Sequence, residues 1–296
     1  MQYQQLIITE PVSNFRALAR QGLQGRWGDA FAKGLLYTLV LSLPLMLILA
    51  LTGGLPMPGD ALAGDEMSGG LYGSYYNLLK GDISQAEYMR QTTGPVGLAY
   101  FYEFLVLGAL TLGITRIFLR YRRRQEAPGE LLFSGFSNYG RAFAAFLLMT
   151  LFTILWTLLF VIPGIIAVYR YKLVFYILAE NPDVGPFEAI RISKEIMRGN
   201  KWKLFCLDLS FIGWMLLAML ASSIISFPLT LPFASSTSHD VVATALYAII
   251  SSLISGVTVG LLQMYQGTSE AAFYERATGL LKYVDEMQPG DTGGGI

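Results

Sequence analysis

Four ionisable side chains lie inside stretches that are otherwise apolar: Glu103, Arg170, Lys172 and Asp208. A charged group near the centre of a membrane helix costs at least ~2.5 kcal/mol on insertion, so each of the four should have a partner of opposite charge. We therefore treat them as a candidate intramembrane polar site, where acidic and basic groups of neighbouring helices could bind a charged substrate or hold the helices together.

Depth along each helix predicts which of these groups can meet. At 1.5 Å per residue, Arg170 lies roughly 15 Å and Glu103 roughly 20 Å from the same side of the membrane, whereas Lys172 lies roughly 12 Å and Asp208 roughly 8 Å deep. We expect Glu103 to pair with Arg170, and Asp208 with Lys172. A purely structural role stays open, because a buried ion pair can fix helix packing and a lysine can snorkel along its own stem.

Other chemistry finds little support. One cysteine, Cys206, excludes an internal disulfide, and with the single histidine, His239, it cannot form a His/Cys zinc site. The sequence also has neither a G-x-x-x-x-G-K-[ST] phosphate loop nor an H-E-x-x-H pair. We therefore expect no metal, no cofactor and no enzymatic activity.

The composition indicates the kind of element that carries these charges. Of the 296 residues, 53% are apolar and only 14% are charged, with a mean hydropathy of +0.48. Soluble domains carry about 25% charged residues, so this chain is predicted to be an all-α, polytopic membrane protein. A net charge of zero argues against nucleic acid as a partner. The six predicted spans are residues 34–51, 96–119, 142–161, 165–179, 204–233 and 241–264.

The third and fourth spans form one apolar stretch, 142–179, which is too long for a single crossing. Pro163 and Gly164 lie in its middle, and the residue before a proline is driven out of helical geometry. We predict a helix break at these two residues. The second half, 165–179, is short, so it could cross the membrane only partly.

The distribution of Lys and Arg predicts the orientation. Most of the 21 basic residues fall in segments on one side of the six spans, which the positive-inside rule assigns to the cytoplasm together with both termini. The cluster RYRRR at 120–124 is interpreted as a topology determinant. The expected layout comprises a cytoplasmic N-terminal segment 1–33, a membrane domain 34–283 with outer loop 52–95 and inner segments 120–141 and 181–203, and a disordered tail 284–296.

Two amphipathic helices are expected on the inner face, at 13–27 and 183–198. Both place apolar residues on one side and basic residues on the other, which is typical of helices that lie on anionic lipid. Either could instead dock a protein partner. In the last span, Ser252, Gly256 and Gly260 repeat every four residues and predict a face for close helix packing, more within one chain than between copies of a homo-oligomer.

Several stretches carry a resemblance to a known family: LWTLLFVIPGIIAVYRYKLVFYILAENP (155–182), GNKWKLFCLDLSFIGW (199–214), FSGF (133–136), ALARQGLQGRW (17–27) and EAAFYE (270–275). They resemble the bacterial integral-membrane family called domain of unknown function 975. The resemblance implies a multi-pass helical protein of the bacterial cytoplasmic membrane with no settled activity, and it supplies no catalytic residues.

Three functions therefore compete. The first is a non-enzymatic scaffold or partner-binding membrane module. The alternative is a small transporter or channel that uses the intramembrane charges, although the two halves of the chain show no sequence repeat. A lipid-modifying enzyme ranks last, because only scattered Asp and Glu residues could act as its acid and base.

Overall fold

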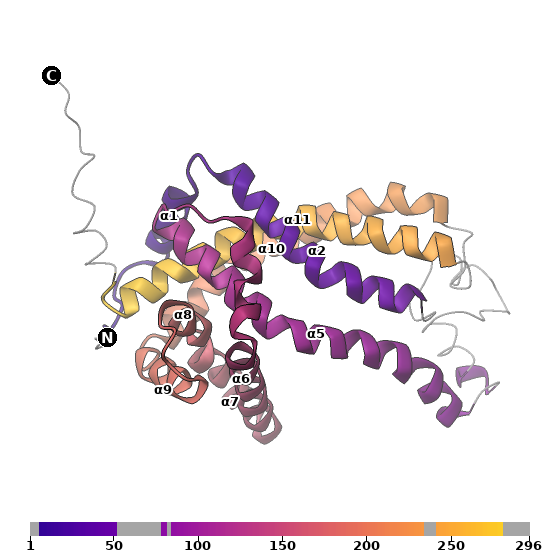
Figure 1. Cartoon of the computed structure of the whole chain (residues 1–296), viewed down its shortest axis with the longest axis horizontal. Helices are drawn as coiled ribbons and strands as arrows, with labels where there is room; N and C mark the ends of the chain where they lie inside the picture. Colours follow the sequence, from indigo (N-terminus) through magenta and orange to yellow (C-terminus); the bar gives the residue numbers. More distant parts are fainter. Residues whose placement is uncertain (1–5, 52–77, 82–83, 234–240, 281–296) are drawn as a thin grey trace. The chain divides into compact units, whose positions relative to one another are not determined.

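The computed structural model describes residues 6–51, 78–81, 84–233 and 241–280, and within these ranges all regular structure is helical (Figure 1). In chain order the elements are α1 (Val12–Leu23), α2 (Trp27–Leu51), α5 (Gln85–Arg122), the 3-10 helix η2 (Gly129–Asn138), α6 (Tyr139–Leu159), α7 (Val161–Tyr171), α8 (Val174–Glu180), α9 (Pro186–Ile196), α10 (Lys201–Thr230), the 3-10 helix η3 (Leu231–Phe233) and α11 (Val241–Ala277). The all-α prediction is confirmed.

Six helical stretches in the described part of the chain are long and apolar enough to cross a membrane. They are Trp27–Leu51, Val96–Arg122, Gly129–Leu159, Val161–Glu180, Lys201–Pro228 and Val242–Ala277. A stretch of about 20 mostly apolar residues is what a bilayer requires. The chain is therefore a multi-pass membrane protein, with the six spans that the sequence predicted.

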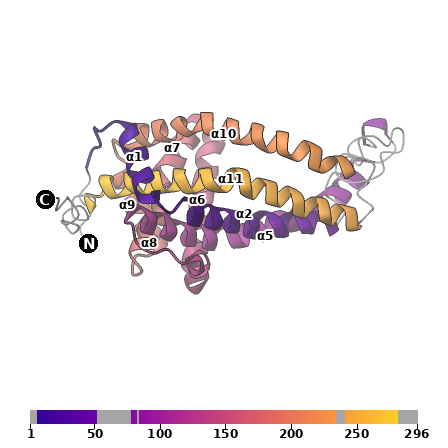
Figure 2. The ribbon, with the colours of Figure 1, turned by 90° about the horizontal axis from the view of Figure 1, so that it is seen from above.

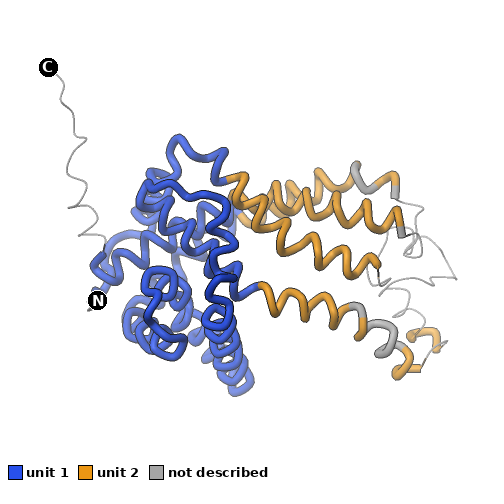
Figure 3. The backbone as a smooth tube through the Cα atoms, viewed as in Figure 1, with its two compact units in different colours: residues 1–30, 107–214, 262–296 blue, residues 31–106, 215–261 orange. Residues whose placement is uncertain are grey.

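The helices divide between two compact units, which Figure 3 colours separately. Unit 1 comprises Met1–Ala30, Leu107–Trp214 and Leu262–Ile296, and unit 2 comprises Phe31–Val106 and Met215–Leu261. Both units are therefore assembled from segments that lie far apart in the sequence. The predicted tail 284–296 and most of the predicted outer loop 52–95 lie outside the described residues, but α5 already begins at Gln85, inside that loop.

Unit 2 depends on a close approach of α2 and α11, which run side by side in Figures 1 and 2. A Cβ atom added to Gly260 would lie 2.7 Å from the carbonyl carbon of Gly34, and one added to Gly256 would meet Leu35. Ser252, one step further along this face, is also buried. The small-residue face of α11 thus packs against a helix of the same chain.

The helix break near Pro163 lies earlier than predicted. Helix α6 ends at Leu159, and Phe160 takes an extended conformation with φ −161° and ψ 149°. Pro163 then occupies the first turn of α7, where its missing N–H is no loss, and its ring is incompatible with a helical carbonyl at Leu159. The proline therefore ends the preceding helix four residues upstream. Gly164 lies within α7, where a Cβ would come 2.2 Å from Oγ1 of Thr157 on α6.

The first amphipathic helix is shorter than predicted, because α1 ends at Leu23 and Trp27 begins α2. Its apolar face is covered by protein: Phe15, Ala19 and Leu23 are fully buried within unit 1. The ring of Phe15 lies 5.5 Å from that of Phe273 on α11, measured between centroids. The apolar pattern of α1 thus reflects packing inside unit 1.

The N-terminal arm, residues 6–10, is fastened in unit 1 by the buried side chain of Asn200. Asn200 Oδ1 accepts a hydrogen bond from the backbone N–H of Ile8 at 3.0 Å, and Nδ2 donates to the Leu6 carbonyl at 2.8 Å and the Ile196 carbonyl at 2.9 Å. Leu6 N–H also donates to the carbonyl of Ala277. One asparagine therefore ties the arm to the turn between α9 and α10.

We predict that Gly260→Ala destabilises the protein more than Gly256→Ala. At position 260 the new methyl meets the backbone of Gly34, so a helix must shift, and overpacking of this kind costs about 1–3 kcal/mol. At position 256 the nearest atom belongs to the flexible end of Leu35, so the loss should be smaller. Thermal unfolding of the detergent-solubilised variants measures both, and an equal or reversed order would contradict this packing.

A second prediction concerns the N-terminal arm. Asn200→Ala leaves the backbone groups of Leu6, Ile8 and Ile196 without their side-chain partner, and an unsatisfied buried group costs about 1–3 kcal/mol. Amide hydrogen exchange at Ile8 should accelerate strongly. Asn14→Ala, the same change at an exposed position, is the control and should leave that exchange rate unchanged. Continued protection of Ile8 in Asn200→Ala would show that other contacts hold the arm.

Candidate intramembrane charge cluster

A cluster of three charged side chains joins three helical segments of unit 1. Lys172 follows the last residue of α7, Asp208 lies on α10 and Glu270 on α11. Lys172 Nζ is 2.6 Å from Asp208 Oδ2 and 3.1 Å from Glu270 Oε1. We call this group the triad; it links residues that are up to about a hundred positions apart in the sequence.

Neutral polar groups complete the surroundings of the triad. Gln266, one turn before Glu270 on α11, points its amide nitrogen at Asp208 Oδ1 (3.4 Å) and at Glu270 Oε1 (3.2 Å). The Tyr169 ring lies 5.8 Å from the Lys172 ammonium. The Tyr176 hydroxyl on α8 donates to the carbonyl of Gly267 at 3.1 Å. The triad and its surroundings are therefore supplied by the end of α7 with Lys172, by α10 and by α11, and α8 is fastened to α11 next to them.

The triad has an uneven charge. Its side chains are 23% (Lys172), 17% (Asp208) and 11% (Glu270) exposed, so all three are largely buried in the protein. Two carboxylates face one ammonium, which leaves one formal negative charge if all three are ionised. An uncompensated charge in such an environment attracts a further positive charge. The arrangement can thus bind a cation or a proton.

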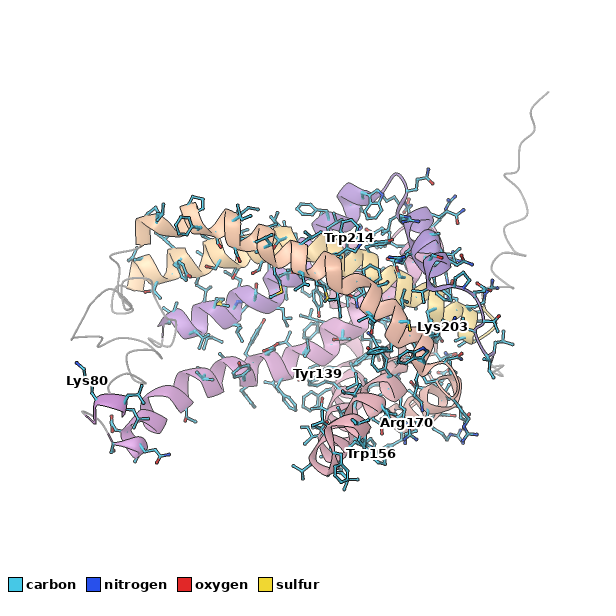
Figure 4. All side chains as sticks on the ribbon, turned by 180° about the vertical axis from the view of Figure 1, so that it is seen from behind. Lys80, Tyr139, Trp156, Arg170, Lys203 and Trp214 are labelled. Atoms are coloured by element: carbon cyan, nitrogen blue, oxygen red, sulfur yellow. The ribbon has the colours of Figure 1, made fainter. Side chains whose placement is uncertain are left out.

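The predicted pair of Lys172 and Asp208 is present, as their depths along the helices had indicated. Arg170, two positions before Lys172, has its guanidinium carbon 6.0 Å from the ring centroid of Trp156 on α6, and both residues are labelled in Figure 4. Glu103 is half-buried in unit 2, whereas Arg170 belongs to unit 1, so their pairing stays a prediction.

Glu270 was missed because the last span was predicted to end at 264. Helix α11 continues to Ala277, and residues 271–274 are fully buried although polar residues surround them in the sequence. Hydropathy falls after Met264, but unit 1 covers this part of α11 with protein. The spacing of Gln266 and Glu270, one helical turn apart, was the available signal that this stretch has a polar face.

A second cluster lies at the end of α5, in the arginine-rich segment interpreted from sequence as a topology determinant. Arg123 Nε is 2.7 Å from Glu275 Oε1, and its Nη2 also binds Glu180 at the end of α8. Arg122 Nε lies 3.4 Å from Glu275 Oε2. Two arginines thus face two glutamates, and this arginine clamp is neutral overall.

Burial and charge act in opposite directions on Arg123. Burial lowers the pKa of its guanidinium, but Glu180 and Glu275 raise this pKa more, so it lies above the ordinary value for arginine. Arg123 therefore keeps its charge at every physiological pH. The clamp is a permanent ion cluster that fastens the end of α5 to α8 and α11, and it has no unbalanced charge with which to bind a ligand.

We predict a large loss of stability for Glu275→Ala. Glu275 is fully buried, and its removal leaves Arg122 and Arg123 with Glu180 as the remaining acid of the clamp. Breaking a buried ion pair by removing one partner costs about 3–5 kcal/mol. Thermal unfolding in detergent should show a strongly lowered melting temperature.

The control for this prediction is Glu188→Ala, which removes the exposed partner of Arg191 on α9, 3.4 Å away. Exposed pairs contribute about 0–1 kcal/mol, so this variant should unfold near the wild-type temperature. Equal effects of the two substitutions would mean that the clamp does not hold unit 1 together.

Comparisons with known proteins bear on the family. No curated protein and no solved structure matches the chain. A family model does match part of it, and the matched part contains every member of the triad as well as Glu180 and Glu275 of the arginine clamp. Residues 157–280 match the family described as protein of unknown function (DUF975), which confirms the predicted resemblance.

Proposed function

We propose that this protein is a non-enzymatic membrane scaffold that presents α9 and the start of α10 to a partner at the membrane surface. We assign it to the bacterial cytoplasmic membrane with both termini in the cytoplasm. The observation that carries the proposal is the division of α9 into a face that packs against protein and a face that is left open.

The buried face of α9 packs against the rest of unit 1. Ala189, Ile190, Ser193 and Ile196 are buried, and α9 packs against α6, α7 and α8. Ser193 Oγ donates to the carbonyl of Arg170 at 2.8 Å, which fixes α9 to the last turn of α7. A helix held in this way presents its other face in a constant orientation, as a docking surface requires.

The open face combines aromatic and charged groups. Phe187 is 68% exposed, Arg191 is exposed on the next turn, and Trp202 at the start of α10 is 72% exposed. Exposed large aromatic side chains mark interaction sites, and arginine, tryptophan and aromatic residues dominate the energy of protein interfaces. The neighbouring basic residues Arg198 and Lys203 also suit anionic lipid headgroups, which we propose as a second partner.

The alternative is a small transporter or channel. The unbalanced charge of the triad favours a transporter or channel, because ionisable groups inside membrane segments are rare and mark ion and proton pathways. Within the described residues the triad is a single cluster and not one member of a chain of charged sites across the membrane. The same residues contain no group of three or more His, Cys, Asp or Glu side chains that could hold a metal ion. We therefore rank this alternative second.

Site-directed photo-crosslinking in living cells tests the scaffold proposal. A photoreactive residue in place of Phe187 should give a crosslinked protein band of constant mass, whereas one in place of Leu158 should react with lipid. Leu158 is 83% exposed near the apolar end of α6, so it is a matched exposed control. Arg191→Glu should weaken the band at 187.

Two results would contradict the proposal. The first is reaction with lipid alone at position 187, which would make α9 a membrane anchor. The second is an equal protein band at 187 and 158, which would show that proximity in the crowded membrane, and not docking on α9, produces the crosslink. A band at twice the mass of the chain would identify the partner as a second copy of this protein.

A further inference from the structure

The triad lacks one positive charge. The arginine clamp, only a few residues away on α11, matches two cations to two anions, whereas the triad has Lys172 against Asp208 and Glu270. Both lie in the same unit, so the difference does not follow from a general surplus of acid. One more positive charge would neutralise the triad.

The distances indicate which carboxyl is ionised. Lys172 Nζ is 2.6 Å from Asp208 Oδ2, a short distance typical of an ammonium bound to a carboxylate, and 3.1 Å from Glu270 Oε1. Glu270 is also the less exposed of the two acids, at 11% against 17%. Asp208 is therefore the closer counter-ion of Lys172, and Glu270 shares the same ammonium at the longer distance.

The contacts of the Glu270 carboxyl differ between its two oxygens. Lys172 and Gln266 both approach Oε1, at 3.1 Å and 3.2 Å. This leaves Oε2 as the oxygen that can carry a proton.

We propose that Glu270 is the site of a reversibly bound proton at neutral pH, held in the triad and released to water. Binding adds one proton to the carboxylate and release returns it to water, so no other reactant is needed. The groups that face the site are Lys172 and Tyr169 from α7, Tyr176 from α8, Asp208 from α10 and Gln266 from α11. The proposal is independent of the scaffold role of α9.

Infrared difference spectroscopy of the full-length protein in lipid nanodiscs tests the proposal. Wild type at neutral pH should show the C=O stretch of one protonated carboxyl that disappears in Glu270→Gln. Asp208→Asn should also remove it, because Lys172 then faces Glu270 alone and stabilises its ionised form. Lys172→Met should double the band, because neither acid retains a counter-ion.

Folding of the variants is checked by their melting temperatures. Gln has the shape of a neutral glutamic acid, so Glu270→Gln should melt close to wild type, whereas loss of an ionised partner of Lys172 would lower its melting temperature clearly. The proposal is overturned if wild type lacks the band at neutral pH, or if Glu270→Gln keeps it. A band that appears only after sodium and potassium are replaced by a large organic cation would assign the site to a metal ion and would also overturn it.

Discussion

A charge that leaves water must find a counter-charge, and this requirement organises unit 1. Glu270 and Glu275 lie five residues apart on α11, and each reaches a cation on a different element: Lys172 after α7 and Arg123 just past α5. Because ammonium and guanidinium groups cannot be left in an apolar environment, these contacts determine where α5, α7, α8 and α10 can lie against the end of α11. Apolar packing alone would leave such helices free to slide or rotate, since lipid chains compete equally well for their surfaces.

The two clusters meet the same requirement in different ways. In the arginine clamp every charge has its opposite, and a guanidinium cannot lose its proton, so the contact is permanent. The triad uses a lysine and two carboxyls, all of which can exchange protons, and it has one acid in excess. The same physical rule therefore gives one cluster that serves only to fasten helices and another whose charge state can change.

The sequence predicts the parts of this arrangement that depend on position along a single helix. The six spans follow from the lengths of the apolar runs, and the contact of Lys172 with Asp208 follows from their similar depths. Glu270 could not be placed in this way, because the polar residues after Met264 are typical of a helix that has left the membrane; they are buried here by other parts of unit 1. A pattern read along one helix does not show which neighbour will cover it.

The helix break shows the same limit at short range. Pro163 correctly indicates that two helices meet, but the conformational change lies at Phe160, because a proline excludes the helical carbonyl four residues before it and is itself acceptable in a first turn. Trp27 was assigned to the wrong helix for a related reason, since an aromatic residue fits the apolar face of either α1 or α2 and only packing decides between them. The pairing of Glu103 with Arg170 depends on how the two units are arranged and stays a prediction.

The matched family segment, 157–280, contains the whole triad but only half of the arginine clamp, because Arg122 and Arg123 precede it. Lys172, which follows α7, Asp208 on α10 and Glu270 on α11 all lie inside this segment, and so does Gln266, whose amide approaches both carboxyls. The triad is therefore a property of the matched segment alone, whereas the clamp joins that segment to α5. A site that can change its charge, built within one segment and braced by a permanent ion cluster against another, is an arrangement in which a proton could alter the packing of α11 without releasing α5.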